Sequence, residues 1–179
     1  MEILFSEIDQ TGIIKLNRPK ALNALNLEMA KKFYDKLLEW EENNNISRVI
    51  LYGEGKHFCA GGDVKSLVLA GKKNQLKCDF FKIEYQLNYL ISQFSKEFLS
   101  IWNGVVMGGG VGLSIYGDHR LVTDNSKFAM PEASIGFFPD VGGSYFLSNL
   151  HGNIGKYVGL TGDVLSVNEL ISVSYTHLR

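Results

Sequence analysis

The alternation of short β-rich runs with amphipathic helical segments is the feature that most constrains the fold of this chain. Residues 48–53 (RVILYG) and 97–104 (EFLSIWNG) have the length and composition of strands. Between them, residues 78–94 carry apolar side chains at the three- and four-residue spacing of a helix. Strands that alternate with helices predict an α/β domain in which layered sheets are flanked by helices.

Other segments extend this alternation. The runs EILFSEI (2–8) and GIIKLN (12–17) predict a hairpin, and residues 26–40 predict a helix that the asparagines at 43–45 end. The other expected elements are a short helix at 64–70, a buried helix within 108–117, strands at 119–123 and 127–130, and a helix at 153–162. A chain of 179 residues is long enough for one domain with a substantial core.

Two glycine-rich segments, AGGD (60–63) and MGGGVG (107–112), each follow a predicted strand and open a predicted helix. The first N–H groups of a helix lack internal partners and carry partial positive charge, and glycine lets a ligand approach that backbone closely. Two such helix ends that face each other would form a pocket for a developing oxyanion. The alternative is that both segments are tight turns with close packing.

Two carboxylates flank an uncharged stretch within residues 131–143 (PEASIGFFPDVGG). Glu132 and Asp140 each follow a proline, which fixes φ where the acid emerges. A buried carboxylate needs a partner or a function. We expect both acids to be buried beside a pocket wall made by Ile135, Phe137 and Phe138.

A third carboxylate, Glu84, belongs to the predicted helix at 78–94. It lies four residues after Phe80 and three before Leu87, which places it within the apolar stripe of that helix. A carboxylate on a core-facing stripe is paired or lines a cavity. The alternative is an acid at the edge of the stripe that extends into solvent.

Composition bears on partners and location. The formal net charge is −1 and there is no basic run, so we expect neither a nucleic acid nor a membrane as a partner. The two cysteines and four scattered histidines lack the spacing of a disulfide framework or a metal site, so we expect no metal and a small buried Cys59. The first residues, MEILFSEI, resemble neither a signal nor a transit peptide, and we expect a cytoplasmic protein.

The last residues differ from the rest of the chain. Residues 173–179 (VSYTHLR) have no amphipathic pattern, and VSYTHL is similar to the translation of a transposon end used in sequencing libraries. We therefore expect residues 173–179 to be a non-native sequencing scar and residues 1–172 to be a truncated core domain. The alternative is a genuine short C-terminal tail.

Four segments in register resemble one protein family. Residues 17–25 (NRPKALNAL), 57–63 (HFCAGGD), 103–114 (NGVVMGGGVGLS) and 128–143 (FAMPEASIGFFPDVGG) are similar to motifs of the crotonase (enoyl-CoA hydratase/isomerase) superfamily. The resemblance covers about residues 10–165 and is strongest to the 3-hydroxyisobutyryl-CoA hydrolase branch. It implies a crotonase-like fold of repeated ββα units.

The resemblance also implies that a C-terminal helical part is missing here. In the family that part covers the acyl pocket, completes the CoA site and often mediates oligomerisation. We therefore expect the full-length protein to form homo-oligomers.

The resemblance implies an acyl-CoA thioester as substrate and no separate cofactor. Two backbone N–H groups of the family bind the thioester carbonyl, and they correspond to Gly62 and Gly109. The substrate-binding residues of the hydrolase branch correspond to Glu84, Gly109, Glu132 and Asp140. The implied CoA-binding residues are Lys20, Ala21, Leu22, Lys56, Ala60, Gly61 and Asp63. Lys20 and Lys56 are candidates for the CoA phosphates, and the alternative for each is a solvated lysine.

The acids distinguish the branches of the family. Typical hydratases use two glutamates, of which one corresponds to Glu132 and the other falls on Gly112. Asp140 corresponds to no acid in typical hydratases. The resemblance therefore implies hydrolysis of 3-hydroxyisobutyryl-CoA to 3-hydroxyisobutyrate and CoA in valine breakdown, with Glu132 and Asp140 as catalytic residues.

The role of Glu132 stays open between a nucleophile that forms a transient anhydride and a base that activates water. Asp140 would bind the 3-hydroxyl of the substrate or assist proton transfer, and Glu84 would line the acyl pocket and bond that hydroxyl. Two alternatives to the hydrolase remain: an enoyl-CoA hydratase/isomerase with Glu132 as its sole acid, and an acyl-CoA-binding protein without catalysis.

Overall fold

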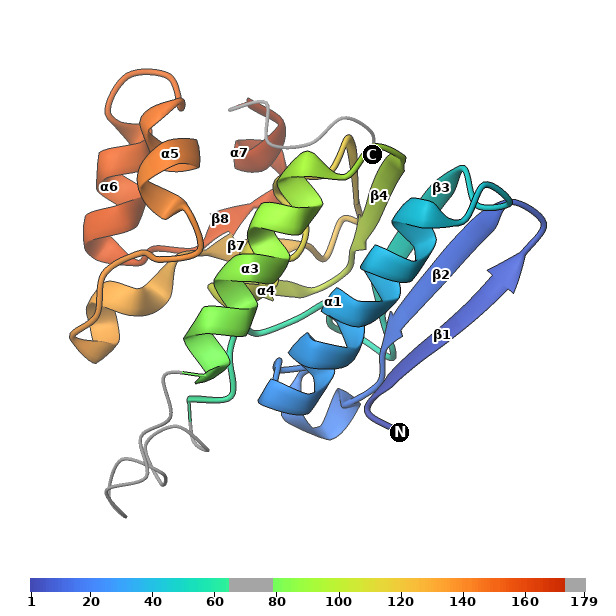
Figure 1. The fold of residues 1–179 in the computed structure, drawn as a ribbon. Helices are drawn as coiled ribbons and strands as arrows, with labels where there is room; N and C mark the ends of the chain where they lie inside the picture. Colours follow the sequence, from blue (N-terminus) through green and yellow to red (C-terminus); the bar gives the residue numbers. More distant parts are fainter. Residues whose placement is uncertain (65–78, 173–179) are drawn as a thin grey trace, which may run out of the picture.

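The chain forms two β-sheets with helices packed around them (Figure 1). The structure is a computed structural model, and it describes residues 1–64 and 79–172. A five-stranded sheet has the order β1-β2-β3-β4-β6, and a three-stranded sheet has the order β5-β7-β8. The predicted α/β fold with layered, helix-flanked sheets is therefore confirmed.

The elements follow one another closely along the chain. The strands are β1 (Ile3–Ile8), β2 (Thr11–Leu16), β3 (Arg48–Gly53), β4 (Glu97–Trp102), β5 (Val105–Met107), β6 (His119–Val122), β7 (Lys127–Ala129) and β8 (Leu165–Ser166). The α-helices are α1 (Leu27–Glu42), α3 (Asp79–Gln93), α4 (Gly109–Gly112), α5 (Gly143–Ser148), α6 (Ile154–Thr161) and α7 (Val167–Ser172). Two 3-10 helices, η1 (Pro19–Ala21) and η2 (Pro131–Ile135), each begin at a proline.

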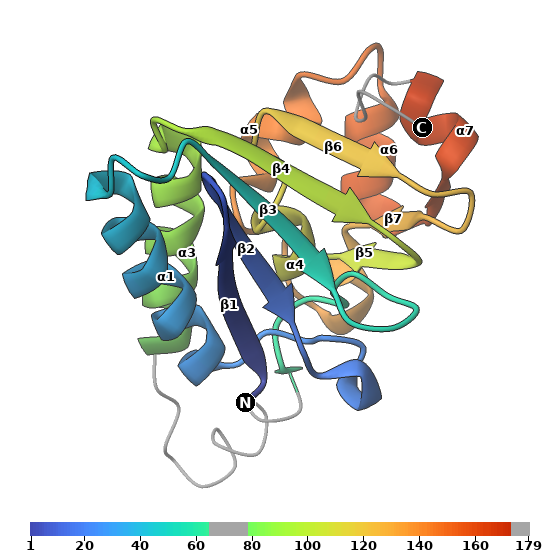
Figure 2. The same cartoon turned by 90° about the vertical axis from the view of Figure 1, so that its right-hand side faces the viewer.

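The N-terminal strands start the larger sheet as the sequence predicts. β1 and β2 pair antiparallel, and β2, β3, β4 and β6 then pair parallel. Parallel strands need a crossover connection, and α1 connects β2 to β3 while α3 connects β3 to β4. The two helices lie side by side along one side of this sheet (Figure 2).

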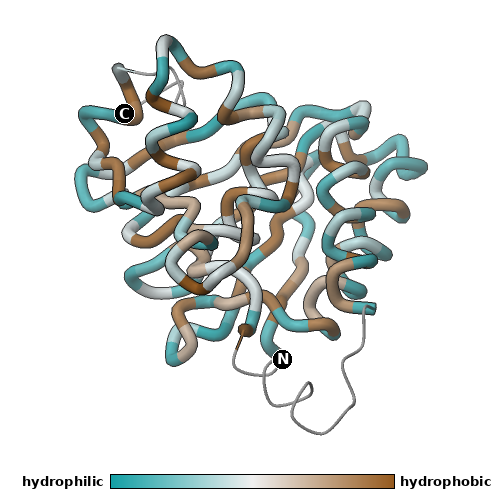
Figure 3. Tube along the Cα trace, turned by 90° about the vertical axis from the view of Figure 1, so that its left-hand side faces the viewer, coloured by the Kyte–Doolittle hydropathy of each residue, from teal (hydrophilic) through white to brown (hydrophobic). Residues whose placement is uncertain are grey.

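Helix α1 shows why these residues are helical. The side chain of Asn26 caps it by accepting a hydrogen bond of 2.9 Å from the N–H of Met29. Its buried residues recur at helical spacing, and hydrophobic and hydrophilic residues alternate along the helices in Figure 3. They are Met29, Ala30, Phe33, Leu37 and Trp40.

Successive strands alternate between the two sheets. β4 and β6 belong to the larger sheet, whereas β5 and β7, which follow them in the chain, belong to the smaller one. After β3, Cys59 likewise forms an isolated parallel bridge with Val106 of β5. This repeated placement of one strand in each sheet brings the connecting glycine turns to the same region of the molecule.

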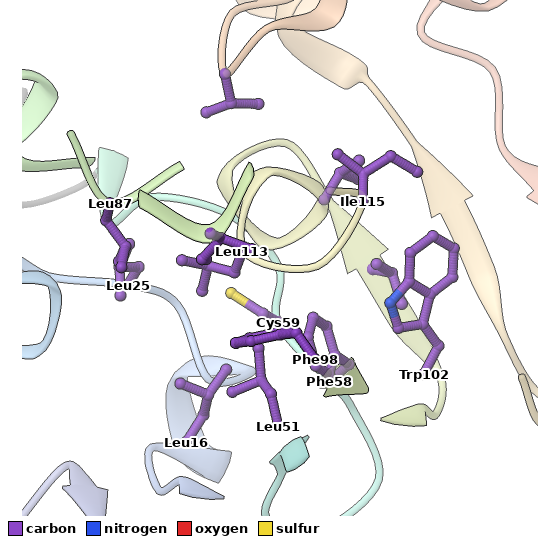
Figure 4. Packing of buried hydrophobic residues seen from close by; sticks show 14 of the residues in the cluster. Leu16, Leu25, Leu51, Phe58, Cys59, Leu87, Phe98, Trp102, Leu113 and Ile115 are labelled. Carbon is purple, nitrogen blue, oxygen red and sulfur yellow. The ribbon is translucent and has the colours of Figure 1, made fainter. Parts of the chain in front are cut away.

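The core fills the space between the sheets and the helices. Figure 4 shows Cys59 and Phe58 close to Leu51 and Phe98 of the larger sheet. Cys59 is fully buried, as expected, and burial raises the pKa of its thiol to about 12. A buried thiol with such a pKa stays protonated and is a packing residue.

Several expected boundaries differ from the structure. The helix expected within residues 108–117 contains only the four residues of α4 and continues as turns. β5, β8, α5 and α7 have no counterpart in the sequence prediction. Apart from Val64, the helix expected at 64–70 lies outside the described residues, as do Cys78 and residues 173–179. No helix in the described part of the chain is both long enough and apolar enough to cross a bilayer.

Candidate functional site

Two glycine turns meet in the structure. Gly61 and Gly108 have φ angles of +106° and +50°, which favour glycine. The nitrogen of Gly62 lies 3.1 Å from the point where a Cβ on Gly109 would be. Within the described residues, neither Gly62 nor Gly109 uses its N–H in a backbone hydrogen bond. Two neighbouring free N–H groups can bind a single oxygen atom.

Backbone hydrogen bonds hold the first turn on both sides. On one side, the N–H of Ala60 donates to the carbonyl of Leu22 at 3.0 Å. On the other side, the N–H of Cys59 donates to Val105 and the N–H of Met107 donates to Cys59, each at 3.0 Å. The turn is therefore fixed between the loop after β2 and strand β5.

The glycine turns and the three predicted acids line one cavity of about 340 Å³, which we call the acid cavity. Gly62, Gly109, Glu84, Glu132 and Asp140 all contribute to its lining. The remaining lining is mainly apolar and includes Phe80, Phe81, Ile135 and Phe137. The structure thus brings together the predicted oxyanion and acid residues from four separate segments of the chain.

One part of the predicted wall is wrong. Ile135 and Phe137 line the acid cavity, but Phe138 is not among the described residues that do so. Its ring stacks on Phe137 with centroids 4.4 Å apart and is 64% exposed. Phe138 therefore packs on Phe137 from the solvent side and does not line the acid cavity.

Glu84 is buried, as its place in the apolar stripe predicts. Only 2% of its surface is exposed, and its Oε1 atom has no hydrogen-bond partner among the described residues. This oxygen lies 2.3 Å from the point where a Cβ on Gly109 would be. Burial first, and then the charges of Asp140 and Glu132, raise the pKa of Glu84 to about 8. The carboxyl is therefore mostly protonated near neutral pH and can donate a hydrogen bond.

Glu132 projects from η2, which Pro131 starts. Its side chain is buried, and its Oε2 atom has no partner among the described residues. The other oxygen, Oε1, would be 2.7 Å from a Cβ on Gly108, so Glu132 directly faces the second glycine turn. Burial first, and then the charge of Asp140, raise the pKa of Glu132 to about 7. A carboxylate with that pKa is a suitable base at neutral pH.

Asp140 is half-buried and differs from the two glutamates in having a strong donor. The hydroxyl of Tyr85 donates to its Oδ2 atom at 2.7 Å. Burial raises the pKa of Asp140, and the Tyr85 hydrogen bond acts in the opposite direction. The next residue, Val141, has a φ of +44°, which is strained for a β-branched side chain. The hydroxyl of Tyr116 bonds the Val141 carbonyl at 2.8 Å and helps to hold this conformation.

The predicted CoA-binding residues occupy two adjoining loops. Ala60 and Gly61 line the acid cavity, whereas Lys20 and Ala21 line a separate cavity of about 520 Å³. Leu22 joins the loops through the hydrogen bond from Ala60 described above. Lys56 is exposed and lines neither cavity within the described part of the chain. Lys56 nevertheless lies near the first loop, because Asn23 donates hydrogen bonds to the carbonyls of Glu54 and His57 on either side of it.

Arg18 links the two loops and was not among the predicted site residues. Its guanidinium bonds the carbonyl of Ala24 at 2.7 Å and pairs with the carboxylate of Asp63 at 3.2 Å and with Glu2 at 2.8 Å. Asp63 thus has a structural partner. The sequence signal was available, since Arg18 precedes the proline of the first motif.

Two further residues of the site region were missed. Tyr85 follows Glu84 directly and bonds Asp140. Asn88 lies one helical turn beyond Glu84, and both polar atoms of its amide are buried without a partner among the described residues. Asn88 lies on the same face of α3 as Glu84, so the helical spacing could have indicated its burial. No pattern in the sequence indicates the Tyr85 contact.

Among the described residues, no group of three or more His, Cys, Asp or Glu side chains could hold a metal ion. His119 begins β6 and pairs with Glu97 at 3.2 Å at the edge of a strand.

Comparison with known proteins identifies close relatives of this chain. The chain is 48% identical over 163 residues to the mitochondrial 3-hydroxyisobutyryl-CoA hydrolase of Danio rerio, covering 90% of this chain and 43% of that protein. It is 48% identical over 173 residues to the probable 3-hydroxyisobutyryl-CoA hydrolase 3 of Arabidopsis thaliana, covering 96% of this chain and 46% of that protein. The chain thus spans less than half the length of these curated relatives.

Solved structures share the fold. An enoyl-CoA hydratase from Rhodobacter sphaeroides superposes with a TM-score of 0.95 at 36% identity, covering 99% of this chain and 54% of that one. A carnitinyl-CoA dehydratase from Mycobacterium thermoresistibile gives a TM-score of 0.95 at 39% identity, covering 99% and 53%. The model of the enoyl-CoA hydratase/isomerase family matches residues 11–177. This chain belongs to the enoyl-CoA hydratase/isomerase family, as its four motifs predicted.

Proposed function

We propose that this chain carries the catalytic core of an acyl-CoA thioester hydrolase that acts on 3-hydroxyisobutyryl-CoA and releases 3-hydroxyisobutyrate and CoA. The observation that carries the proposal is the composition of the acid cavity, in which Asp140 joins Glu132 beside two free backbone N–H groups. The relatives named as hydrolases of this substrate support the same choice.

The backbone supplies the electrostatic part of the reaction. The carbonyl oxygen of the thioester would accept hydrogen bonds from the N–H groups of Gly62 and Gly109, which lie close together and make no backbone hydrogen bond to any described residue. These bonds strengthen as negative charge develops on that oxygen in the transition state. Each donor of this kind contributes on the order of 2.7–4 kcal/mol to transition-state stabilisation.

Glu132 supplies the reacting carboxylate. As a base, it takes a proton from water while the water oxygen adds to the carbonyl carbon. The carbon–sulfur bond then breaks, and the thiolate of CoA takes a proton to leave as the thiol. As a nucleophile, Glu132 adds to the carbonyl carbon itself, the carbon–sulfur bond breaks to give an anhydride, and the thiolate of CoA takes a proton and leaves. Water then hydrolyses the anhydride to the free acid and regenerates Glu132. A pKa of about 7 keeps a large fraction of Glu132 ionised at neutral pH in either case.

Isotope labelling separates these two roles of Glu132. In a single turnover in ¹⁸O-water, a base mechanism places the label in the released acid and leaves the enzyme unlabelled. Through an anhydride, water that attacks the Glu132 carbonyl carbon instead places the label in the Glu132 side chain. Mass spectrometry of the peptide that contains residues 131–143 reads out the difference.

Asp140 and Glu84 bind the acyl group in this proposal. Asp140 accepts a hydrogen bond from Tyr85 and would accept another from the 3-hydroxyl of the substrate or assist proton transfer. Glu84, mostly protonated near neutral pH, would bond the same hydroxyl as a donor. The different protonation of these neighbouring acids lets them take different roles at one pH.

Hydration of an enoyl-CoA is the weaker candidate because position 112 has no space for a second acid. A Cβ on Gly112 would lie 2.7 Å from Cβ of Val141 and 2.9 Å from Nδ2 of Asn88. A glutamate there would need both neighbours to move. With glycine at position 112, the cavity contains Glu132 but lacks the second glutamate that typical hydratases use.

A paired assay with the full-length protein tests the proposal. Release of free thiol from 3-hydroxyisobutyryl-CoA supports the hydrolase. Loss of enoyl absorbance from crotonyl-CoA without thiol release would replace it with the hydratase/isomerase. Tight binding of acyl-CoA without either reaction would favour a binding protein.

Location and assembly remain predictions. We predict a cytoplasmic protein from the sequence, whereas the names of vertebrate relatives such as the Danio rerio protein place those proteins in mitochondria. We also predict that the full-length protein forms homo-oligomers. Fractionation of cells and light scattering of the purified protein test these two predictions.

A further inference from the structure

Tyr85 lines a second cavity of about 500 Å³ and bonds Asp140, which lines the acid cavity. Two pairs of sequence neighbours, Glu84–Tyr85 and Asp140–Val141, each contribute one residue to each cavity. The first member of each pair lines the acid cavity, and the second member lines the second cavity. The hydrogen bond from Tyr85 to Asp140, at 2.7 Å, joins the two segments, which together form a partition between the cavities.

The second cavity has a distinct chemistry. None of its described lining residues is charged, and four of them are tyrosines. Its most buried polar group is the amide of Asn88, whose Nδ2 and Oδ1 atoms have no partner among the described residues. A cavity of this kind suits an uncharged chain that carries an oxygen for the amide to bond.

The two segments of the partition differ in how easily they can be altered. Val141 is buried in a strained backbone conformation that Tyr116 holds by a hydrogen bond of 2.8 Å. Tyr85, by contrast, is 39% exposed and contributes a single side chain to the partition. Shortening this side chain is therefore the smallest change that would connect the two cavities.

We propose that Tyr85 is a specificity-determining residue that limits the length of the acyl group, and that the second cavity is the space a longer, uncharged acyl chain would fill if Tyr85 were smaller. This inference rests on the proposed thioester hydrolase. In the wild-type protein the partition confines the acyl group to the 340 Å³ of the acid cavity. Asn88 would favour longer chains that carry a hydroxyl or keto oxygen over plain alkyl chains.

A series of thioesters from butanoyl-CoA to decanoyl-CoA tests the partition in the full-length protein. Tyr85→Ala is expected to raise the ratio of kcat/KM for octanoyl-CoA over butanoyl-CoA by about tenfold or more, because added methylenes gain a place to be buried. Tyr85→Phe keeps the ring and is expected to leave this ratio within about twofold of wild type. Tyr157→Ala is the matched control, since Tyr157 also bonds an aspartate, Asp163, but lines neither cavity.

A second measurement of substrate preference tests the role of the Asn88 amide. In the Tyr85→Ala background, 8-hydroxyoctanoyl-CoA is expected to be preferred over octanoyl-CoA, and Asn88→Ala is expected to remove that preference. If Tyr85→Ala fails to fold, Tyr85→Leu replaces it, since leucine retains an apolar contact with Phe81 while shortening the side chain.

An unchanged length ratio in a folded Tyr85→Ala or Tyr85→Leu protein would overturn the inference, as would a wild-type protein that already prefers octanoyl-CoA. Failure of the wild type to release thiol from any thioester would instead overturn the proposed function. In that case the affinities of the same variants for S-butyl-CoA and S-octyl-CoA, which cannot be hydrolysed, still test the partition.

Discussion

The hydroxyl of Tyr85 donates a hydrogen bond of 2.7 Å to the carboxylate of Asp140, which lies 55 residues further along the chain. This contact gives Asp140 a donor that Glu84 and Glu132 lack, because each of these glutamates retains an unpartnered oxygen within the described residues. A hydrogen bond to a carboxylate favours its charged form. The three acids of the cavity thus have different environments although they line the same space.

Tyr85→Phe should therefore shift the acidic limb of the pH profile of kcat/KM to higher pH. Loss of the donor raises the pKa of Asp140 further above its ordinary value, so a larger fraction is protonated at a given pH. We expect roughly a tenfold fall in kcat/KM at pH values below the pKa of Asp140, from the typical 1.5–3 kcal/mol of a hydrogen bond to a charged group. Tyr157→Phe removes another tyrosine–aspartate bond and should leave the profile in place. An unshifted limb in Tyr85→Phe would show that Asp140 does not act in its ionised form.

Glu132→Gln should lower kcat by about 10²–10⁴-fold with a much smaller change in KM, because the amide has nearly the same shape but neither accepts a proton nor attacks a carbonyl. Steady-state thiol release at pH 7 measures the effect. Glu28→Gln, on the exposed face of α1, is the control for a glutamate-to-glutamine change elsewhere and should retain full activity. Retained catalysis in Glu132→Gln would remove this residue from the chemistry.

Gly109→Ala keeps the backbone N–H but should displace it, and we expect kcat/KM to fall by up to about 10²–10³-fold, the loss typical of an oxyanion donor that no longer reaches the substrate. The new Cβ would be 2.3 Å from Oε1 of Glu84, so either the turn or the glutamate must move. Thermal unfolding should also show a loss of about 1–3 kcal/mol, typical of overpacking.

Gly159→Ala provides the control in helix α6, where the nearest atom to a new Cβ is the flexible end of Leu147 at 3.2 Å. Activity near the wild-type level in both alanine variants would contradict the expectation that a Cβ at position 109 displaces the N–H from the substrate.

Glu84→Gln should stabilise the protein increasingly as the pH rises from about 5 to about 8. The folded state raises the pKa of Glu84 from 4.5 to about 8, so the folded protein binds more protons than the unfolded chain in this interval. Stability must then fall with rising pH until the folded carboxyl ionises, and it levels off above that pH. Glutamine cannot ionise and removes this loss.

The measurement is the difference in Tm between Glu84→Gln and wild type across pH 5–9. It should increase by on the order of 5 °C and reach a plateau above about pH 8. A difference that stays constant over this range would mean that Glu84 ionises in the folded protein much as it does in the unfolded chain.

The sequence predicted the helices and strands whose hydrophobic patterns extend over enough residues to be recognised. Helices α1 and α3 and strands β1 to β4 occur where periodicity placed them, and the place of Glu84 in an apolar stripe correctly indicated its burial. Strands β5 and β8 have only three and two residues, too few to show alternation. Their pairing depends on partners that lie far away in the chain.

The features of the candidate site were likewise predicted only in part. The glycine turns and acids were recognisable because each belongs to a local motif, but their meeting in one cavity depends on how strands alternate between the two sheets. The partition formed by Tyr85 had no local signal, since its partner is defined only by tertiary packing. Phe138 shows the converse error, because an apolar residue next to a cavity-lining one can face solvent.

The segment of residues 59–63 hydrogen-bonds to the loop after β2 on one side and to β5 on the other. The hydrogen-bonded amides of Cys59, Ala60 and Asp63 therefore cannot exchange with solvent by fraying at an edge. Their hydrogen exchange should require the same cooperative opening that unfolds the core, and the rates should follow global stability. A drug or mutation that loosens this part of the protein would consequently lower its abundance in the cell together with its activity, instead of producing a folded but inactive enzyme.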